Sequence, residues 1–301
     1  MAHPRYLMNS LLAGALLLAT ASLSLSTTVV AQQKKTPNVN RAPQLVRTIS
    51  RHESRRFGYG GTLTIIGAPQ GSITIEGWAK NEVDISAEIE LHADTETDLN
   101  LLAAVNTFVV DEDPVHLSVL STGTHDKAFM RAAAKKFPKT LLGLSWKIDY
   151  RIRVPLAIDL EINAGRGPIS IAGVDGDIRL SATESEANLK LSGGSLSATI
   201  AAGKVNLNIP VRSWRGLGAE IRLALGEVTI ELPAAFNGDI DAQILRSGEI
   251  VDSFGGLEPR EKPGITAQIM KARAGAGGAA FHFTVGDGVI FIKKQTADSR
   301  Q

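Results

Sequence analysis

The sequence predicts an all-β fold, and within that class a β-solenoid of short stacked strands with one or two short helical insertions. Apolar residues recur at alternate positions, as at Ile73 and Ile75 or at Leu189 and Leu191, which is the pattern of a strand with one buried and one wet face. These runs begin about every 7–12 residues and are separated by turns rich in glycine or asparagine, such as residues 173–177. Short strands suit a solenoid, where each strand stacks on its equivalent one coil away. A β-sandwich needs longer strands and is the alternative, because the spacing of the runs is irregular.

Residues 1–31 have the pattern of a secretory signal peptide. Arg5 supplies a basic start, residues 11–18 are apolar, and Ala31 ends a run of small residues ahead of a polar segment. An uncleaved membrane anchor is the alternative, since residues 11–31 are just long enough to span a bilayer, but serine and threonine dilute the second half of this stretch. After cleavage no segment is long and apolar enough to cross a membrane as a helix. The sequence therefore predicts an exported protein of the periplasm or the cell surface.

Residues 32–56 are predicted to be a flexible leader, because their first part is polar and contains two prolines. The folded domain is expected over residues 57–292, and residues 293–301 are expected to be a disordered tail. The chain contains no cysteine, which excludes disulfide bonds and the lipidated cysteine of a lipoprotein. Its charges balance, with 32 Lys and Arg against 31 Asp and Glu, so no global field attracts nucleic acid.

Two segments are predicted to be helical insertions. Residues 94–106 have acidic residues in the first turn and apolar residues at helical spacing, which is typical of a short amphipathic helix with a capped start. Residues 127–137 also have a helical pattern, and Pro138 ends it. Residues 145–154 then form the longest alternating run, and the set that begins with Trp146 is the expected buried face of that strand.

A pattern of glycine followed by alternating aliphatic residues recurs along the chain. In the second half it is carried by Ile152–Pro155, Asn163–Ile171, Gly173–Ile178, Gly203–Val205 and Gly226–Pro233. The early segments Gly71–Trp78 and Glu82–Ile85 share it. In this pattern the chain resembles the bacterial putative-adhesin family, which consists of exported β-solenoid proteins that mostly carry a domain-of-unknown-function label. The resemblance covers residues 57–292, with residues 123–142 departing from it as an insertion, and it implies a fold and a compartment but brings no functional residues.

No catalytic, metal or cofactor site is predicted. Histidines such as His52 and His282 show no ligand spacing, and Asp175 and Asp177 flank Gly176 as turn residues do, without the strict repeat of a calcium-binding solenoid. The leading hypothesis is therefore a non-enzymatic structural or interaction protein of the cell envelope. The alternatives are a periplasmic accessory or sensing module that binds glycan, lipid or protein and, as a minor alternative, a glycan-active enzyme.

The first candidate interaction site is Trp214 with its neighbours Arg212 and Arg215. These residues occupy the longest gap between strand starts, residues 205–221, which predicts a loop at a corner of the fold. An exposed indole between two guanidinium groups could stack on a sugar ring or engage a partner protein. The alternative is that the ring covers an open flank of the core while the arginines stay in water.

The second candidate is the basic insertion at residues 127–142, where Arg131, Lys135 and Lys136 have no acid within the segment. A basic amphipathic helix can lie on an anionic lipid surface or on lipopolysaccharide. The alternative is that the helix covers one side of a sheet with its lysines solvated. An envelope glycan, an anionic lipid surface or another protein is thus the expected partner.

Overall fold

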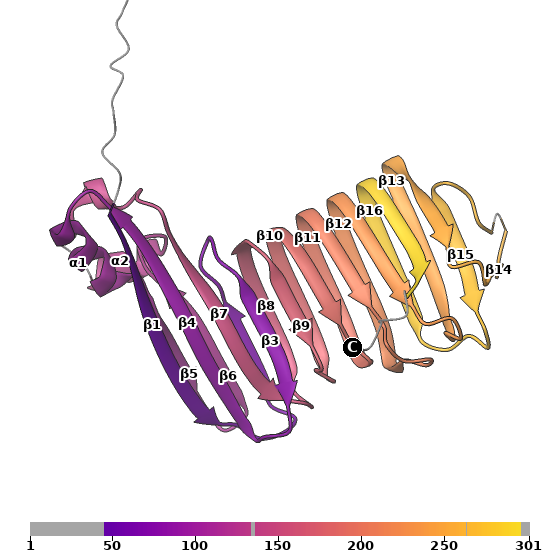
Figure 1. The fold of residues 1–301 in the computed structure, drawn as a ribbon, viewed down its shortest axis with the longest axis horizontal. Coiled ribbons are helices and arrows are strands. Elements are labelled where there is room, and N and C mark those ends of the chain that lie inside the picture. Colours follow the sequence, from indigo (N-terminus) through magenta and orange to yellow (C-terminus); the bar gives the residue numbers. More distant parts are fainter. Residues whose placement is uncertain (1–44, 134–135, 263, 296–301) are drawn as a thin grey trace, which may run out of the picture. The chain divides into compact units, whose positions relative to one another are not determined.

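The computed structural model describes residues 45–133, 136–262 and 264–295, and within them the protein is all-β, as predicted. Sixteen strands of this described part form one large mixed sheet, and Figure 1 shows how they follow one another. The predicted signal peptide, the first part of the predicted leader and most of the predicted tail lie outside the described residues.

The two helices lie in the segments where the sequence predicted them, and each is short. The elements up to the seventh strand are β1 (Leu45–Arg56), β2 (Thr62–Ile66), β3 (Ile73–Trp78), β4 (Glu82–Ala93), α1 (Glu96–Val105), β5 (Thr107–Glu112), β6 (His116–Thr122), α2 (Lys127–Ala133), a 3-10 turn (Lys139–Leu141) and β7 (Trp146–Pro155). The later strands are β8 (Asp159–Arg166), β9 (Ile169–Ala172), β10 (Asp177–Lys190), β11 (Gly193–Asn208), β12 (Arg215–Leu232), β13 (Gly238–Ser253), β14 (Leu257–Pro259), β15 (Ile269–Ala274) and β16 (Ala280–Lys294).

The strands from β10 onward include long ones, whereas the sequence predicted short ones throughout. β10 has 14 residues and β12 has 18. The first half of β10 pairs with β8 and its second half pairs with β9. One bent strand therefore contains two apolar runs that the sequence pattern had assigned to separate strands, and the residues between the runs form a bend rather than a turn.

Glycines in register make this bend possible. Gly203, Gly226 and Gly288 are cross-strand partners on β11, β12 and β16, with φ of 131°, 138° and 147°. A Cβ atom on Gly226 would lie 1.9 Å from the carbonyl oxygen of Gly203, and one on Gly288 would lie 1.7 Å from that of Gly226. Glycine is required here because each backbone approaches its neighbour so closely.

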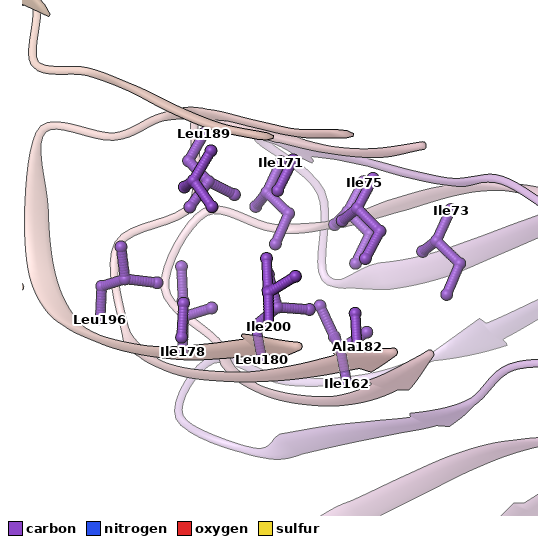
Figure 2. Close-up of a cluster of buried hydrophobic side chains, with 14 of the residues drawn as sticks. Ile73, Ile75, Ile162, Ile171, Ile178, Leu180, Ala182, Leu189, Leu196 and Ile200 are labelled. Atoms are coloured by element: carbon purple, nitrogen blue, oxygen red, sulfur yellow. The ribbon is translucent and has the colours of Figure 1, made fainter. Parts of the chain in front are cut away.

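Because its strands bend, the sheet forms two facing layers with the core between them. The first layer has the strand order β1-β4-β7-β3-β9, the second has β5-β6-β2-β8, and both continue into the bent strands from β10 onward. Figure 2 shows Leu189, Ile171 and Ile75 of the first layer facing Leu180 and Ile162 of the second. Each of these five side chains is at most 3% exposed, so this part of the core is a stack of aliphatic residues.

Neighbouring strands in the middle of the sheet are parallel. Equivalent positions on β10 and β11 are 18 residues apart, as for Asn188 and Asn206. The order changes at the C-terminal end, where β16 lies between β12 and β13, and β15 and β14 complete the sheet as antiparallel strands. The order of the strands in the sheet thus differs from their order along the chain, which is one reason why the apolar runs are irregularly spaced in the sequence.

β1 corrects the prediction of a flexible leader through residue 56. Its 12 residues pair antiparallel with β4, from Leu45 opposite Ala93 to Arg56 opposite Glu82. Alternate side chains, among them Ile49, are partly buried while the others face water. The polar composition of this segment belongs to an edge strand, where charged side chains are common.

α1 packs against β4 and β1. Thr95 caps its start, because the Thr95 hydroxyl oxygen accepts a hydrogen bond of 3.1 Å from the backbone N–H of Asp98. Arg47 of β1 donates hydrogen bonds to Glu96 and Asn100 of the helix. Within the described part of the chain, none of the helices combines the length and the apolar character that a membrane span requires.

Candidate functional site

The outward side chains of the first layer form a broad polar surface, which we call the polar face. Cross-strand pairing arranges these side chains in rows that run from strand to strand. From β1 to β11, the row through Arg151 consists of His52, Ser86, Arg151, Thr74, Ser170, Asn188 and Asn206. The next position, Thr229 on β12, is buried. We call this row the Arg151 row. Its other members carry hydroxyl, amide or imidazole groups, so Arg151 is its one permanent charge.

The neighbouring row carries charges of alternating sign. In sheet order its ionisable residues are Asp84, Arg153, Glu76, Lys190, Glu231 and Lys293. Arg153 Nη2 lies 2.5 Å from Asp84 Oδ2, and Lys293 Nζ lies 3.2 Å from Glu231 Oε1. Each charge in this row has an opposite charge on the adjacent strand or on the strand after it, an arrangement that stabilises the surface of a sheet.

A hollow of about 860 Å³ opens on the polar face, where β1, β4, β7 and β3 meet the turn at residues 166–168. Its ionisable lining residues include His52, Lys147, Arg151, Arg166, Glu88 and Asp149. Arg51 also borders the hollow, but its guanidinium turns to the second layer, where Nη1 donates a hydrogen bond of 2.8 Å to the carbonyl oxygen of Phe108. Much of the remaining lining is serine, threonine and glycine, so the hollow is polar and open to hydrogen bonding.

Asp149 holds the turn beside the hollow. Its Oδ1 accepts hydrogen bonds from the backbone N–H and the hydroxyl of Ser72, each of 2.7 Å, and Lys147 Nζ lies 3.4 Å from its Oδ2. Partial burial acts to raise the pKa of Asp149, but the contacts with Ser72 and Lys147 outweigh burial and the pKa is lowered. Asp149 therefore remains a carboxylate and is a poor proton donor for acid catalysis.

Arg153 and His52 are held together by Asp84 at one side of the hollow. His52 Nε2 lies 2.8 Å from Asp84 Oδ1. Burial acts to raise the pKa of Asp84, but the hydrogen bonds from His52 and Arg153 lower it overall. The Arg153 guanidinium also lies over the ring of Trp78, 4.4 Å from the ring centroid. Arg153 is thus engaged by contacts within the protein.

Arg151 lacks contacts of this kind. Its cross-strand neighbours are Ser86 on β4 and Thr74 on β3, and among the described residues its exposed guanidinium has no acidic partner. Arg166, also in the lining, lies 3.5 Å from Glu184, with 65% and 64% of the two side chains exposed, and an exposed pair of this kind contributes little. Arg151 and Arg166 are therefore available to a ligand.

This arrangement suits the binding of an anion. Guanidinium groups bind the oxygens of carboxylate, sulfate and phosphate through pairs of N–H donors. The hydroxyl groups of Ser86 and Thr74 flank Arg151 in its row and can donate to the same anion. The hollow offers donors and positive charge at a surface that water and large ligands can reach.

Trp214 is not part of this surface, and its indole is buried, as in the alternative that the ring covers a flank of the core. Its side chain is 7% exposed, and Nε1 donates a hydrogen bond of 3.0 Å to the carbonyl oxygen of Gly194. The indole meets the ring of Phe281 edge to face, with the centroids 5.5 Å apart. Burial of a large aromatic ring with its N–H satisfied is favourable, so Trp214 closes a flank of the core.

The arginines beside Trp214 stay in water. Arg212 is exposed, and Arg215, with 72% of its side chain exposed, lies 3.0 Å from Asp175. Neither lines the hollow on the polar face. Their role in binding a partner remains a prediction.

The basic insertion is also separate from the hollow. Arg131 is exposed on α2, and Lys136 is exposed after the gap in the described residues, in which Lys135 lies. Neither Arg131 nor Lys136 lines the hollow. Met130 of the same helix is buried, as expected for a helix that covers a sheet with its cations solvated.

The sequence pattern did not single out Arg151. It lies within the predicted strand 145–154, whose outward residues include Lys147, Asp149 and Arg153. That alternation predicts a wet face, but it does not show which charge lacks a partner. The answer depends on β1, β4 and β3, and this strand contacts residues far away in sequence, such as Ser72, which is 77 residues from Asp149.

No family model matches the chain, and no curated protein matches it in sequence. Several solved structures match the chain at low sequence identity and low TM-score. A putative cell adhesion protein from Clostridium sporogenes is 13% identical, with a TM-score of 0.41 over 82% of this chain and 100% of that chain. A putative adhesin from Bacteroides fragilis is 14% identical, with a TM-score of 0.31 over 83% of this chain and 97% of that chain. A putative lipid binding protein from Parabacteroides distasonis is 11% identical, with a TM-score of 0.20 over 82% of this chain and 97% of that chain.

Proposed function

We propose that this protein is a non-enzymatic, exported cell-envelope protein, an adhesin-like module that binds its partner on the polar face. The observation that carries the proposal is the Arg151 row with its hollow. Together they form a surface of hydroxyl, amide and guanidinium groups that crosses the strands from β1 to β11. Such a surface offers many hydrogen-bond donors and acceptors to an extended ligand.

The architecture proposed for this module is a β-solenoid. Its parallel central strands, the aligned glycines at the bends and the 18-residue step from Asn188 to Asn206 support it. Repeated coils give a stiff face on which equivalent side chains form ladders. The hydrogen bond from Asn206 Nδ2 to Asn188 Oδ1, of 2.9 Å, is one such contact.

The titratable groups support binding over catalysis. A typical glycoside hydrolase needs one carboxylic acid whose pKa is raised, so that it can protonate the leaving group. Within the described part of the chain, the carboxyl groups with a displaced pKa all have it lowered: Asp84, Glu90, Asp113, Asp149, Asp239, Glu261 and Asp287. These groups favour ion pairs and are poor proton donors.

The lack of cysteine allows a direct test of the face. Asn188→Cys introduces one thiol in the middle of the polar face, and Thr199→Cys introduces one on the outward surface of the second layer, both at exposed positions. Each variant is coupled to a maleimide-linked polyethylene glycol, and co-sedimentation with isolated cell envelopes is measured before and after coupling. A polymer at Asn188→Cys is expected to abolish sedimentation, and a polymer at Thr199→Cys is expected to leave it unchanged.

The reverse result assigns binding to the other surface and contradicts the proposal. Failure of the uncoupled protein to sediment with envelopes also contradicts it. Protease shaving of intact cells, with a periplasmic marker as the control, then tests the compartment. Loss of the protein while the marker survives supports adhesion at the surface, and protection until the outer layer is breached supports the periplasmic accessory role.

A further inference from the structure

We propose that the hollow binds an acidic polysaccharide, and that Arg151 holds one of its carboxylate, sulfate or phosphate groups. This inference rests on the proposed binding function of the polar face and names the class of ligand.

The cross-strand register distinguishes Arg151 from Arg153, the other arginine of β7, because it gives the two residues different neighbours. Arg153, on the same face, is opposed by Asp84 across the β4–β7 pair, whereas Arg151 is opposed by Ser86 on one side and Thr74 on the other. Opposite charges at directly facing positions stabilise a sheet. A hydroxyl group facing an arginine stabilises it much less. Arg151 therefore keeps its N–H donors for a group from outside the protein.

The other charges of the hollow favour an anion as that group. Lys147, Arg151 and Arg166 line the hollow against Glu88 and Asp149. Asp149 accepts internal hydrogen bonds and pairs with Lys147, which also lies 3.3 Å from Glu90. Arg151 and Arg166 are therefore the cations of the hollow that remain for a ligand. The pair formed by Arg166 is exposed and 3.5 Å long, and a ligand anion can replace its partner at little cost.

The surroundings favour a sugar polymer over a lipid surface. Of the described residues that line the hollow, none is leucine, isoleucine, valine, phenylalanine, tyrosine or tryptophan, whereas surfaces that bind membranes insert apolar side chains beside their basic ones. Beyond the hollow the Arg151 row continues through Ser170, Asn188 and Asn206. Their hydroxyl and amide groups can exchange hydrogen bonds with the hydroxyl groups of successive sugar units.

The test uses the complete exported protein, isolated from the cells that produce it. Four probes are offered to it. Alginate carries carboxylates, dextran sulfate carries sulfates, neutral dextran carries no charge, and phosphatidylglycerol vesicles present a lipid phosphate. Dissociation constants are measured by titration calorimetry for the natural protein, for Arg151→Gln and for Arg179→Gln. Arg179 is an exposed arginine on the outward surface of the second layer, on β10, so its substitution makes the same chemical change away from the hollow.

The natural protein and Arg179→Gln are expected to bind at least one acidic polymer, and Arg151→Gln is expected to bind it about tenfold more weakly. Arg151→Lys keeps the charge but loses the paired donors, so its affinity is expected to lie between the two. Neutral dextran is expected to bind weakly or not at all. Thermal unfolding of each variant checks that the fold is intact, and Arg151→Lys carries the test if Arg151→Gln does not fold.

Equal affinity of the natural protein and Arg151→Gln for the acidic polymers overturns the inference, as does equal binding of neutral dextran. Binding to the vesicles without binding to either acidic polymer overturns the polysaccharide in favour of an anionic lipid surface. If envelopes retain the protein while neither acidic polymer binds, the polar face keeps its proposed function and the inference about its ligand is wrong.

Discussion

Arg153 and Asp84 lie directly opposite each other on β7 and β4, and Arg153 Nη2 is 2.5 Å from Asp84 Oδ2. Only 10% of the Asp84 side chain is exposed, and His52 reaches the same carboxylate from β1. One carboxylate therefore joins three neighbouring strands. The pair also shows what Arg151 lacks, since Arg151 lies two residues away on the same face of β7 and has hydroxyl groups in place of a carboxylate.

Replacing Asp84 by asparagine is expected to lower the free energy of unfolding by about 1–2 kcal/mol at pH 7, because Arg153 and His52 lose a charged partner. Arg153 is 53% exposed, so water screens part of the loss. Urea unfolding measures the change, and Asp111→Asn, at an exposed position on β5, is the control. A change at Asp84 no larger than that at Asp111 would show that the three-strand contact contributes nothing.

The contribution of Asp84 is expected to depend on pH. The fold lowers the pKa of Asp84 from its ordinary value of 3.8, so the unfolded chain binds a proton at this group more readily than the folded one. The stabilisation is complete well above pH 3.8 and is lost as the pH falls through the folded-state pKa. The difference in unfolding free energy between the natural protein and Asp84→Asn is therefore expected to shrink on acidification from pH 6, and a constant difference would contradict the assignment.

Gly226→Ala is expected to destabilise the protein by about 3 kcal/mol or more, or to prevent folding. The added Cβ would lie 1.9 Å from the carbonyl oxygen of Gly203, and the φ of 138° disfavours a side chain at this position. Gly143→Ala is the matched control, because its Cβ meets nothing within 4 Å. Thermal unfolding measures both variants. Equal melting temperatures would mean that the bends do not bring the backbones into close contact.

Trp214→Ala is expected to lower the free energy of unfolding by about 3–5 kcal/mol, since it removes a buried aromatic side chain. Trp214→Phe keeps much of the ring but leaves the carbonyl oxygen of Gly194 without its donor, so a smaller loss of about 1–2 kcal/mol is expected. Leu217→Ala, at a side chain that is 81% exposed, is the control. Loss of envelope binding by a Trp214→Ala protein of unchanged stability would restore the hypothesis of an interaction residue.

Local alternation was enough to predict the all-β class and the orientation of β7. Trp146, Ile148, Tyr150 and Ile152 are buried, as their spacing predicted. Alternation reports which side chains share a face within one strand, and it needs no knowledge of the neighbouring strands. The same local signal at residues 94–106 predicted α1, because a capping residue and an acidic first turn act within the helix itself.

The bends and the edge strand could not be predicted in this way. A glycine between two apolar runs fits a turn and a bend equally well, and the choice at Gly203 depends on the backbone of Ser185 one strand away, whose carbonyl oxygen would lie 2.0 Å from an added Cβ. β1 is polar because it is an edge strand with one face in water, and its partner β4 follows it at a distance in sequence. The burial of Trp214 likewise depends on Phe281.

The candidate site depends entirely on such distant pairings. Arg151 has the same local surroundings as Arg153, with alternate charges along one strand. The two arginines differ in the residue of β4 that faces them, which is Ser86 for Arg151 and Asp84 for Arg153. The register of an antiparallel pair follows from the whole hydrophobic pattern of both strands, so an unmatched charge becomes visible only in the folded sheet.

The two basic regions of the protein are expected to differ in their effect on binding. The double substitution Arg131→Gln with Lys136→Gln removes two exposed cations from α2 and the segment after it, and neither residue lines the hollow. At physiological salt, exposed charges more than about 8–10 Å from a ligand are largely screened. The affinity for an acidic polymer is therefore expected to fall less than about threefold, compared with about tenfold for Arg151→Gln alone.

The comparison is made by the same calorimetric titration at about 0.15 M salt, with thermal unfolding as the check on folding. α2 has seven residues and buries Met130, so replacing its outward cations is expected to leave the helix in place, whereas deleting the segment would remove buried packing and confuse the two effects. A tenfold loss from the double substitution, with none from Arg151→Gln, would move the binding site from the hollow to the basic insertion.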